Sequence, residues 1–103
     1  MFEFLKKLFG PGVDYKALVA AGAMVVDVRS PQEYASGHLK GSINLPLETI
    51  KQKAGELKKK NKVIITVCRS GARSGMAKAM LKKEGIEVYN GGSWNGLANK
   101  LNS

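Results

Sequence analysis

The sequence predicts an α/β fold, with a central parallel sheet of about five short strands and helices on both faces. Short β-branched apolar segments alternate with segments whose apolar residues recur at helical spacing. Residues that begin and end helices stand at the boundaries between these segments. The length of 103 residues and the apolar fraction of 44% suit one globular domain with a real core.

The chain divides into residues 1–12, an amphipathic segment that ends in a Gly-Pro-Gly break, and residues 13–103, the folded domain. Phe2, Leu5 and Phe9 share one helical stripe, from which the two lysines of this segment are absent. We expect the segment to pack on the domain or fray. A membrane surface or a docked partner is the alternative.

The first half of the domain begins with a helix over 15–21, which Asp14 can cap. Residues 24–28 are short, apolar and β-branched, as in a buried strand. Ser30 then begins a brief helix, because it forms a capping box with the glutamate three residues later and is followed by proline. Gly37 ends that helix.

In the middle of the domain, the sequence predicts a short strand over 42–45 and a helix over 48–57. Gly55 weakens the end of that helix. Residues 63–67 form the most strongly predicted strand of the chain.

The last third predicts a helix over 72–84 and a strand over 86–89. Gly91-Gly92 is expected to form a turn, after which Ser93 caps a helix over 94–101.

The net charge of +9 favours anionic partners. Nucleic acid is the obvious candidate, but the lysines are scattered and no RNA-binding motif or recognition helix is present. The one run, Lys58-Lys59-Lys60, is interpreted as a solvated face. We therefore expect no nucleic-acid partner.

The cysteine and histidine counts exclude several classes of site. One cysteine permits no internal disulfide, no CxxC redox pair and no cysteine-rich zinc site. With one histidine as well, a metal site would need mostly carboxylates, and no cluster of them is present, so we expect no metal. No run of about twenty apolar residues predicts a transmembrane segment, and the first nine residues do not form a secretory signal. The expected compartment is the cytoplasm.

The single cysteine, Cys68, stands where the strongest strand ends and a helix begins. If the loop of residues 68–73 curls, its backbone N–H groups form an anion-binding nest, which the positive end of the following helix reinforces. Arg69 and Arg73 add charge, and Gly71 permits a conformation that other residues resist. Such surroundings favour a thiolate.

A second polar segment, Asp27-Val28-Arg29, also follows a predicted strand. The carboxyl ends of parallel strands meet at one edge of a sheet, where ligands bind. We therefore expect this segment to meet the Cys68 loop.

Phosphate-ester hydrolysis and sulfur transfer both use a thiolate in an anion cradle. Phosphatases of this type carry five residues between cysteine and arginine, whereas four lie between Cys68 and Arg73. The smaller cradle suits one extra sulfur atom better than a phosphate. Val67 also occupies a position where such phosphatases commonly have histidine.

Three linked segments resemble the single-domain rhodaneses, which are thiosulfate or persulfide sulfurtransferases. The resemblance covers roughly residues 13–101. Its segments are Asp27-Val28-Arg29 with Glu33-Tyr34 and the run from Gly37 to Pro46, the loop Val67 to Ser74, and Gly91-Gly92 followed by Trp94. Leu39, Lys40 and Ser42 depart slightly from the pattern, and none touches the expected chemistry.

The resemblance implies that Cys68 is the nucleophile and carries a persulfide, without a cofactor. The substrate-binding residues would be Arg69, Ser70, Gly71, Ala72, Arg73 and Ser74. Asp27 and Arg29 would support the site through ion pairs, with Glu33 a candidate partner of Arg29. The implied substrates are a small anionic sulfur donor such as thiosulfate and a cyanide or thiol acceptor, with a sulfur-relay protein as a further possible partner.

Several residues near these segments also have structural interpretations. We expect a hydrogen-bonding role for His38 and a strand-end ion pair with Arg29 for Asp27. Ser70 and Ser74 can donate to the sulfur or cap the helix, and for Ser74 we expect capping. Trp94 is expected in the core, with the pocket border as an alternative. Two other functions stay open: a persulfide relay or partner-binding module, and a cysteine-dependent phosphatase or arsenate reductase of related fold.

Overall fold

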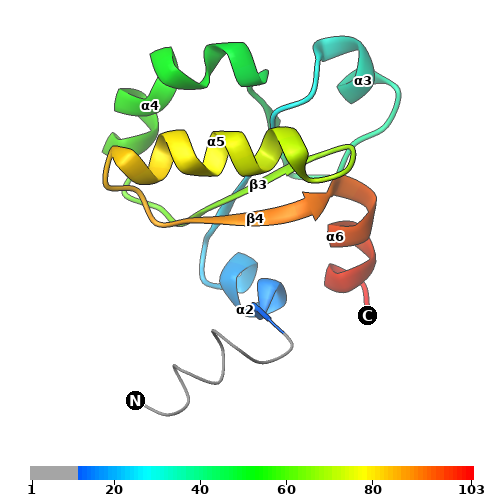
Figure 1. The fold of residues 1–103 in the computed structure, drawn as a ribbon. Helices are drawn as coiled ribbons and strands as arrows, with labels where there is room; N and C mark the ends of the chain where they lie inside the picture. The colour runs from blue at the N-terminus through cyan, green and yellow to red at the C-terminus, as the bar shows by residue number, and fades with distance from the viewer. Residues whose placement is uncertain (1–11) are drawn as a thin grey trace.

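The computed structural model describes residues 12–103, which form an α/β fold around one parallel sheet with strand order β2-β1-β3-β4 (Figure 1). Within these residues the sheet has four strands, not about five. They are β1 (Met24–Asp27), β2 (Ile43–Asn44), β3 (Ile64–Cys68) and β4 (Val88–Ser93). The predicted parallel arrangement is confirmed, and β1 and β3 occupy its interior.

Helices cover both faces of the sheet, as the alternating pattern predicts. In Figure 1, α4 (Ile50–Lys59) and α5 (Ala72–Lys83) lie on one face, and α2 (Tyr15–Ala20) and α6 (Trp94–Leu101) on the other. The short α3 (Pro31–Ala35) follows β1, and a 3₁₀ turn, η1 (Leu47–Thr49), precedes α4.

Two apolar clusters hold these layers together. One lies under α4 and α5 and includes Val26, Ile64 and Leu81, which are all fully buried. The other lies under α2 and α6 and includes Ile65 and Leu97. Because successive side chains of a strand point to opposite faces, Ile64 and Ile65 of β3 enter different clusters.

Local sequence signals account for three helix starts. The Asp14 carboxylate accepts from the N–H of Ala17, and Ser30 forms the complete capping box with Glu33. The Ser93 hydroxyl accepts from the N–H of Gly96 at the start of α6. These caps confirm the predicted starts.

The glycine pair Gly91-Gly92 does not form the predicted turn. Both residues continue β4, whose register with β3 shifts between Thr66 and Cys68. A Cβ on Gly91 would lie 2.8 Å from Ile65 Cγ2 and 3.1 Å from the Thr66 carbonyl oxygen. Gly91 is therefore needed for close approach to β3.

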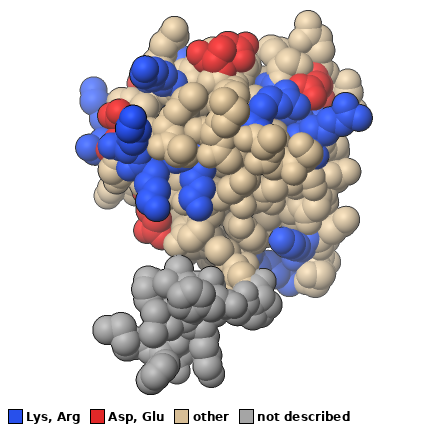
Figure 2. Space-filling model, in the orientation of Figure 1, with Lys and Arg blue, Asp and Glu red and all other residues tan. Residues whose placement is uncertain are grey.

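Charged side chains stand in separate groups around the visible face of the molecule, with an uncharged area between them (Figure 2). Lys58, Lys59 and Lys60 at the end of α4 are all exposed, in keeping with a solvated face. The predicted stripe of Phe2, Leu5 and Phe9 lies outside the described residues. In residues 12–103, every helix is too short or too polar to cross a membrane.

Candidate functional site

Cys68 is the last residue of β3, and its side chain is almost completely buried. The chain then turns sharply at Gly71, whose φ of 108° lies in the left-handed region that favours glycine. The turn directs the Gly71 N–H at the thiol, with 2.9 Å from nitrogen to Sγ, and the Ser74 N–H approaches Sγ at 3.4 Å. Backbone donors thus converge on the sulfur.

Two opposing effects set the pKa of the Cys68 thiol. Burial is the larger single effect and by itself raises the pKa. Hydrogen bonds from the Ser74 hydroxyl and from the backbone N–H groups of Ser74, Gly71 and Ser70 stabilise the thiolate. Together they outweigh burial, so the pKa lies below the ordinary thiol value.

Ser74 does not cap the helix, contrary to the prediction. The residue at the N-cap of α5 is Gly71, and Ser74 lies inside the first turn with its side chain fully buried. Its Oγ is 3.3 Å from Cys68 Sγ and 2.6 Å from Asn90 Oδ1. Ser74 is therefore a partner of the sulfur.

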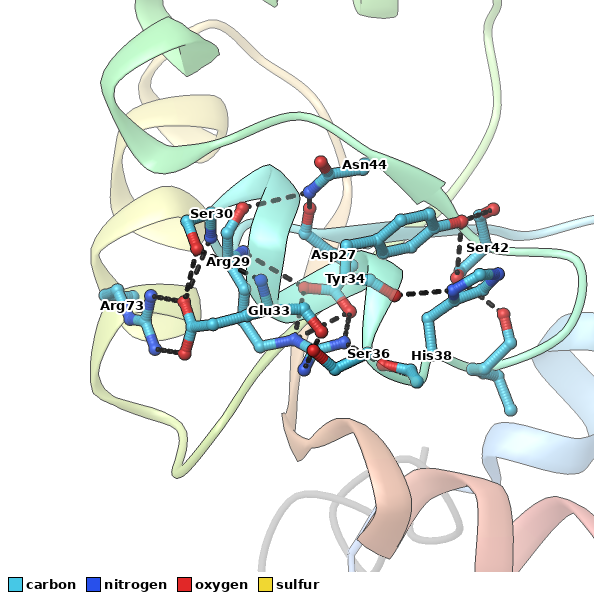
Figure 3. Close-up of polar contacts among 12 residues, drawn as sticks. Asp27, Arg29, Ser30, Glu33, Tyr34, Ser36, His38, Ser42, Asn44 and Arg73 are labelled. Atoms are coloured by element: carbon cyan, nitrogen blue, oxygen red, sulfur yellow. Dashed lines mark hydrogen bonds and ion pairs between the residues drawn. The ribbon is translucent and has the colours of Figure 1, made fainter.

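Arg73 of α5 binds the Glu33 carboxylate through both terminal nitrogens, at 2.7 and 3.0 Å (Figure 3). The predicted Arg29–Glu33 ion pair is therefore wrong, because the Glu33 carboxylate binds Arg73 and the Ser30 backbone instead. The Arg73 side chain, followed by the Ser30 N–H, lowers the pKa of Glu33 to about 2. The same ion pair raises the pKa of Arg73.

Asp27 and Arg29 form a buried ion pair at the end of β1. Arg29 Nη2 lies 2.7 Å from Asp27 Oδ2, and Arg29 Nε donates to both carboxylate oxygens. Arg29 also donates to the carbonyl oxygens of Glu33 and Gly37, and its guanidinium lies 4.9 Å from the Trp94 ring centroid. This arginine therefore joins β1 to the middle of α3, to the residue Gly37 just beyond it, and to Trp94 at the start of α6.

A shallow pocket opens beside the loop and receives side chains from three segments. Its lining consists of Arg29, Glu33, Ser36, Arg69, Trp94 and Asn95. Arg69 is exposed, as are Ser70 and Ala72 of the loop. Trp94 fulfils both of its predicted positions, since it packs against the core cluster under α6 and borders this pocket. The pocket therefore offers an approach to the loop beside the exposed Arg69.

His38 lies away from the sulfur and within the α3 region. Its Nδ1 is 2.8 Å from the Tyr34 carbonyl oxygen, and its ring stacks on the Tyr34 ring at 3.8 Å between centroids (Figure 3). The ring thus has the hydrogen-bonding position expected for it. Across residues 12–103, His, Cys, Asp and Glu side chains form no cluster of three or more that could hold a metal ion.

Sequence reasoning missed Asn90 on β4. Its Oδ1 accepts from Ser74 and from the Gly92 N–H, and its Nδ2 donates to the Gly71 carbonyl oxygen. The contacts depend on the pairing of β4 with β3, which brings residue 90 beside the loop. The only sequence signal was its place directly before the glycine pair.

The site thus combines a stabilised thiol, convergent backbone donors and an arginine-lined approach, which suits nucleophilic attack on a small anionic sulfur donor. The family model described as the rhodanese-like domain matches residues 13–99.

The chain is also similar to several named proteins and to solved structures. The chain is 33% identical to the thiosulfate sulfurtransferase PspE of Escherichia coli over 97 residues, covering 92% of this chain and 93% of PspE. It is 39% identical over 69 residues to the uncharacterized protein YqhL of Bacillus subtilis, covering 66% of this chain but only 54% of YqhL. A solved structure described as a rhodanese with anions from E. coli has a TM-score of 0.68 and 34% identity, covering 75% of this chain and 93% of that one. The chain therefore belongs to the rhodanese-like domain family, whose relatives include sulfurtransferases.

Proposed function

We propose that this protein transfers a sulfane sulfur from an anionic donor such as thiosulfate, through a persulfide on Cys68, to cyanide or a thiol. The observation that carries the proposal is the convergence of the Gly71 N–H and the Ser74 N–H and hydroxyl on the sulfur of Cys68. These donors favour the thiolate that must attack, and no cofactor is required.

The first step forms a sulfur–sulfur bond to the protein. The Cys68 thiolate attacks the outer sulfur of thiosulfate, whose own S–S bond breaks, and sulfite leaves with the electron pair. The outer sulfur, now bound to Cys68, carries the negative charge. Backbone N–H groups at the start of α5 are suited to stabilise this charge.

The second step regenerates the thiolate. A cyanide or thiolate acceptor attacks the outer sulfur of the persulfide, and the electrons of the S–S bond return to Cys68. Cys68 is the only cysteine in the sequence, so no second thiol of this chain can resolve the persulfide. The acceptor must therefore come from outside the chain.

The proposal gives the remaining site residues distinct roles. Arg69, which is exposed at the pocket, attracts the donor. The backbone of residues 69–74 cradles the transferred sulfur, and Arg73 holds the loop end to α3 through Glu33. The buried pair of Asp27 and Arg29 fixes the neighbouring strand end.

Intact-mass measurement after incubation with thiosulfate tests this function. We expect the wild-type chain to gain one sulfur atom and to lose it when cyanide is added, with thiocyanate as product. The Cys68→Ser variant should gain none. A wild-type chain that remains unmodified by thiosulfate and by persulfide donors would reject the proposal.

The phosphatase alternative predicts a different outcome. Hydrolysis of an aryl phosphate that disappears in Cys68→Ser would support it. The four-residue spacing between Cys68 and Arg73 opposes it, because the loop is one residue shorter than in such phosphatases.

A further inference from the structure

The side chain of Asn90 touches three parts of the Cys68 site. Its Oδ1 lies 2.6 Å from Ser74 Oγ and 3.0 Å from the Gly92 nitrogen. Its Nδ2 lies 3.1 Å from the carbonyl oxygen of Gly71, the residue whose own N–H points at the sulfur. The Tyr15 hydroxyl also donates to the Asn90 backbone carbonyl, at 2.9 Å. Asn90 is thus held firmly beside Gly71 and Ser74, two of the residues that donate to Cys68.

The Ser74 hydroxyl has one proton and two acceptors within reach, Cys68 Sγ at 3.3 Å and Asn90 Oδ1 at 2.6 Å. A protonated Cys68 can donate its S–H to Ser74 Oγ, which leaves the Ser74 proton for Asn90. A Cys68 thiolate has no proton to donate and must accept one. The geometry therefore permits two hydrogen-bonding arrangements that differ only in the direction of one hydroxyl proton.

We propose that Asn90 is a positioning residue that competes with the Cys68 sulfur for the Ser74 hydroxyl proton. With a thiol at Cys68, the Ser74 proton points to Asn90. When a base in solution removes the thiol proton, rotation about the Cβ–Oγ bond turns the Ser74 proton to the thiolate. The Ser74 proton never leaves its oxygen, so only the thiol proton is released.

A second donor to Asn90 Oδ1, the Gly92 N–H, lowers the free-energy cost of this rearrangement. After Ser74 turns away, Asn90 Oδ1 still accepts from the Gly92 N–H. The acceptor is therefore not left unsatisfied, which would otherwise oppose the turn. Through this hydrogen bond, Gly92 near the end of β4 is linked to the protonation state of Cys68.

This competition deepens the proposed function, on which its catalytic meaning rests. In the transfer reaction the thiolate is the attacking form and also the form released when the acceptor takes the sulfur. Each formation of the thiolate would turn the Ser74 proton toward the sulfur, and each protonation would return it to Asn90. The competition should hold the pKa of Cys68 above the value that a free Ser74 donor would produce.

Charged and titratable groups also stand on the elements around Cys68, and Arg73 interacts electrostatically with it. They are Asp27 and Arg29 at the end of β1, Glu33 of α3, Arg69 of the loop, Arg73 of α5 and Tyr15 of α2. Within residues 12–103, none of these side chains is hydrogen-bonded to the Ser74 hydroxyl or the Asn90 amide. Their effect should therefore be nearly the same in variants of Ser74 and Asn90 and should cancel in a comparison of the two.

A double-mutant cycle on the pKa of Cys68 tests the proposal. The pKa is read from the pH dependence of alkylation by iodoacetamide, which is specific because the chain has one cysteine. Ser74→Ala should raise the pKa, since it removes a donor to the thiolate. Asn90→Ala should lower the pKa by about one pH unit more when Ser74 is present than in the Ser74→Ala background.

The same cycle can overturn the proposal. Equal changes in both backgrounds would show that Asn90 acts only through its bond to the Gly71 carbonyl. A larger rise with Ser74 present would also reject the competition. Thermal unfolding of every variant confirms that folded proteins are compared.

Asn90→Asp provides a second variant of nearly the same size if Asn90→Ala does not fold. Its carboxylate holds the Ser74 proton more strongly, so it should raise the pKa of Cys68 more with Ser74 present than in Ser74→Ala. An equal rise in the two backgrounds, the effect of charge alone, would reject the proposal. These titrations need no sulfur donor. Coupled pKa changes in a protein that takes no sulfur from thiosulfate or from persulfide donors would therefore reject the proposed function and leave the competition standing.

Discussion

Arg73 at the end of the cysteine loop and Glu33 on α3 form a two-bonded ion pair, with 2.7 Å from Nη1 to Oε1 and 3.0 Å from Nη2 to Oε2. The Glu33 carboxylate also accepts from the backbone N–H of Ser30 and completes its capping box. One carboxylate therefore secures both the start of α3 and the first turn of α5.

This ion pair predicts a specific acid dependence of stability. The pKa of Glu33 falls from 4.5 to about 2 in the folded protein, mainly through Arg73 and then the Ser30 N–H. The contribution of this ion pair to the free energy of unfolding is complete above 4.5, the pKa of the unfolded chain. It is lost as the pH falls toward the folded pKa of about 2. Urea unfolding across this range should show a steeper loss in wild type than in Glu33→Gln. Glu56→Gln removes an exposed pair and should keep the wild-type slope.

Because Gly71 is in a left-handed turn, its substitution should lower both the stability of the fold and the fraction of Cys68 that is ionised. Gly71→Ala must adopt a φ of 108°, which costs about 1–2 kcal/mol. Any relaxation moves the Gly71 N–H away from the sulfur, so the pKa of Cys68 should rise and alkylation near neutral pH should slow. Gly22→Ala is a matched control, because Gly22 has a similar φ of 105° in open space far from the loop in sequence. An unchanged Cys68 pKa in Gly71→Ala would contradict this prediction.

The buried pair of Asp27 and Arg29 should be more important for stability than any exposed pair. Asp27→Ala leaves a buried guanidinium without its carboxylate and should cost about 3–5 kcal/mol of the free energy of unfolding. Arg29→Lys should also be destabilising, since an ammonium cannot reproduce the two-bonded contact. Lys53→Gln, which breaks the exposed Lys53–Glu56 pair, should cost less than about 1 kcal/mol. Similar losses in denaturant unfolding for Asp27→Ala and Lys53→Gln would argue against this account.

Two glycine-to-alanine substitutions should change stability in opposite directions. Gly91→Ala places a Cβ 2.8 Å from Ile65 Cγ2 and 3.1 Å from a backbone oxygen of β3, so it should cost about 1–3 kcal/mol. Gly55 lies within α4, and an added Cβ there would have nothing within 4 Å. Gly55→Ala should therefore stabilise the protein by about 0.5–1 kcal/mol. Thermal unfolding midpoints that move in the same direction would contradict the assignment of crowding to Gly91.

Most of the fold was predictable because its signals are local. A capping box such as Ser30 with Glu33 requires only a few neighbouring residues, and β-branched runs such as 63–67 indicate strands without knowledge of their partners. The proximity of the ends of β1 and β3 was also predictable, because the ends of parallel strands share one edge, and Asp27 does pair with Val67, the neighbour of Cys68.

The errors concern contacts between separate elements. The resemblance suggested Glu33 as a partner for Arg29, but Arg73 reaches it from α5, forty residues later in the chain. Gly91-Gly92 has the composition of a turn, yet the irregular pairing of β4 with β3 keeps it in the sheet. Ser74 is placed by the geometry of the loop, which turns its hydroxyl inward to the sulfur. Each outcome depends on packing between segments, which a local pattern does not contain.

The burial of Cys68 at the end of an interior strand also makes this thiol a reporter of how often the strand end and its loop open. Only 1% of its surface is exposed, and β3 is paired on both sides. A bulky aromatic disulfide, unlike small reagents such as thiosulfate and iodoacetamide, should reach the sulfur only when the loop or the end of β3 opens. The rate of its reaction at increasing denaturant should therefore measure the free energy of that opening, with the protein's own cysteine as the only label.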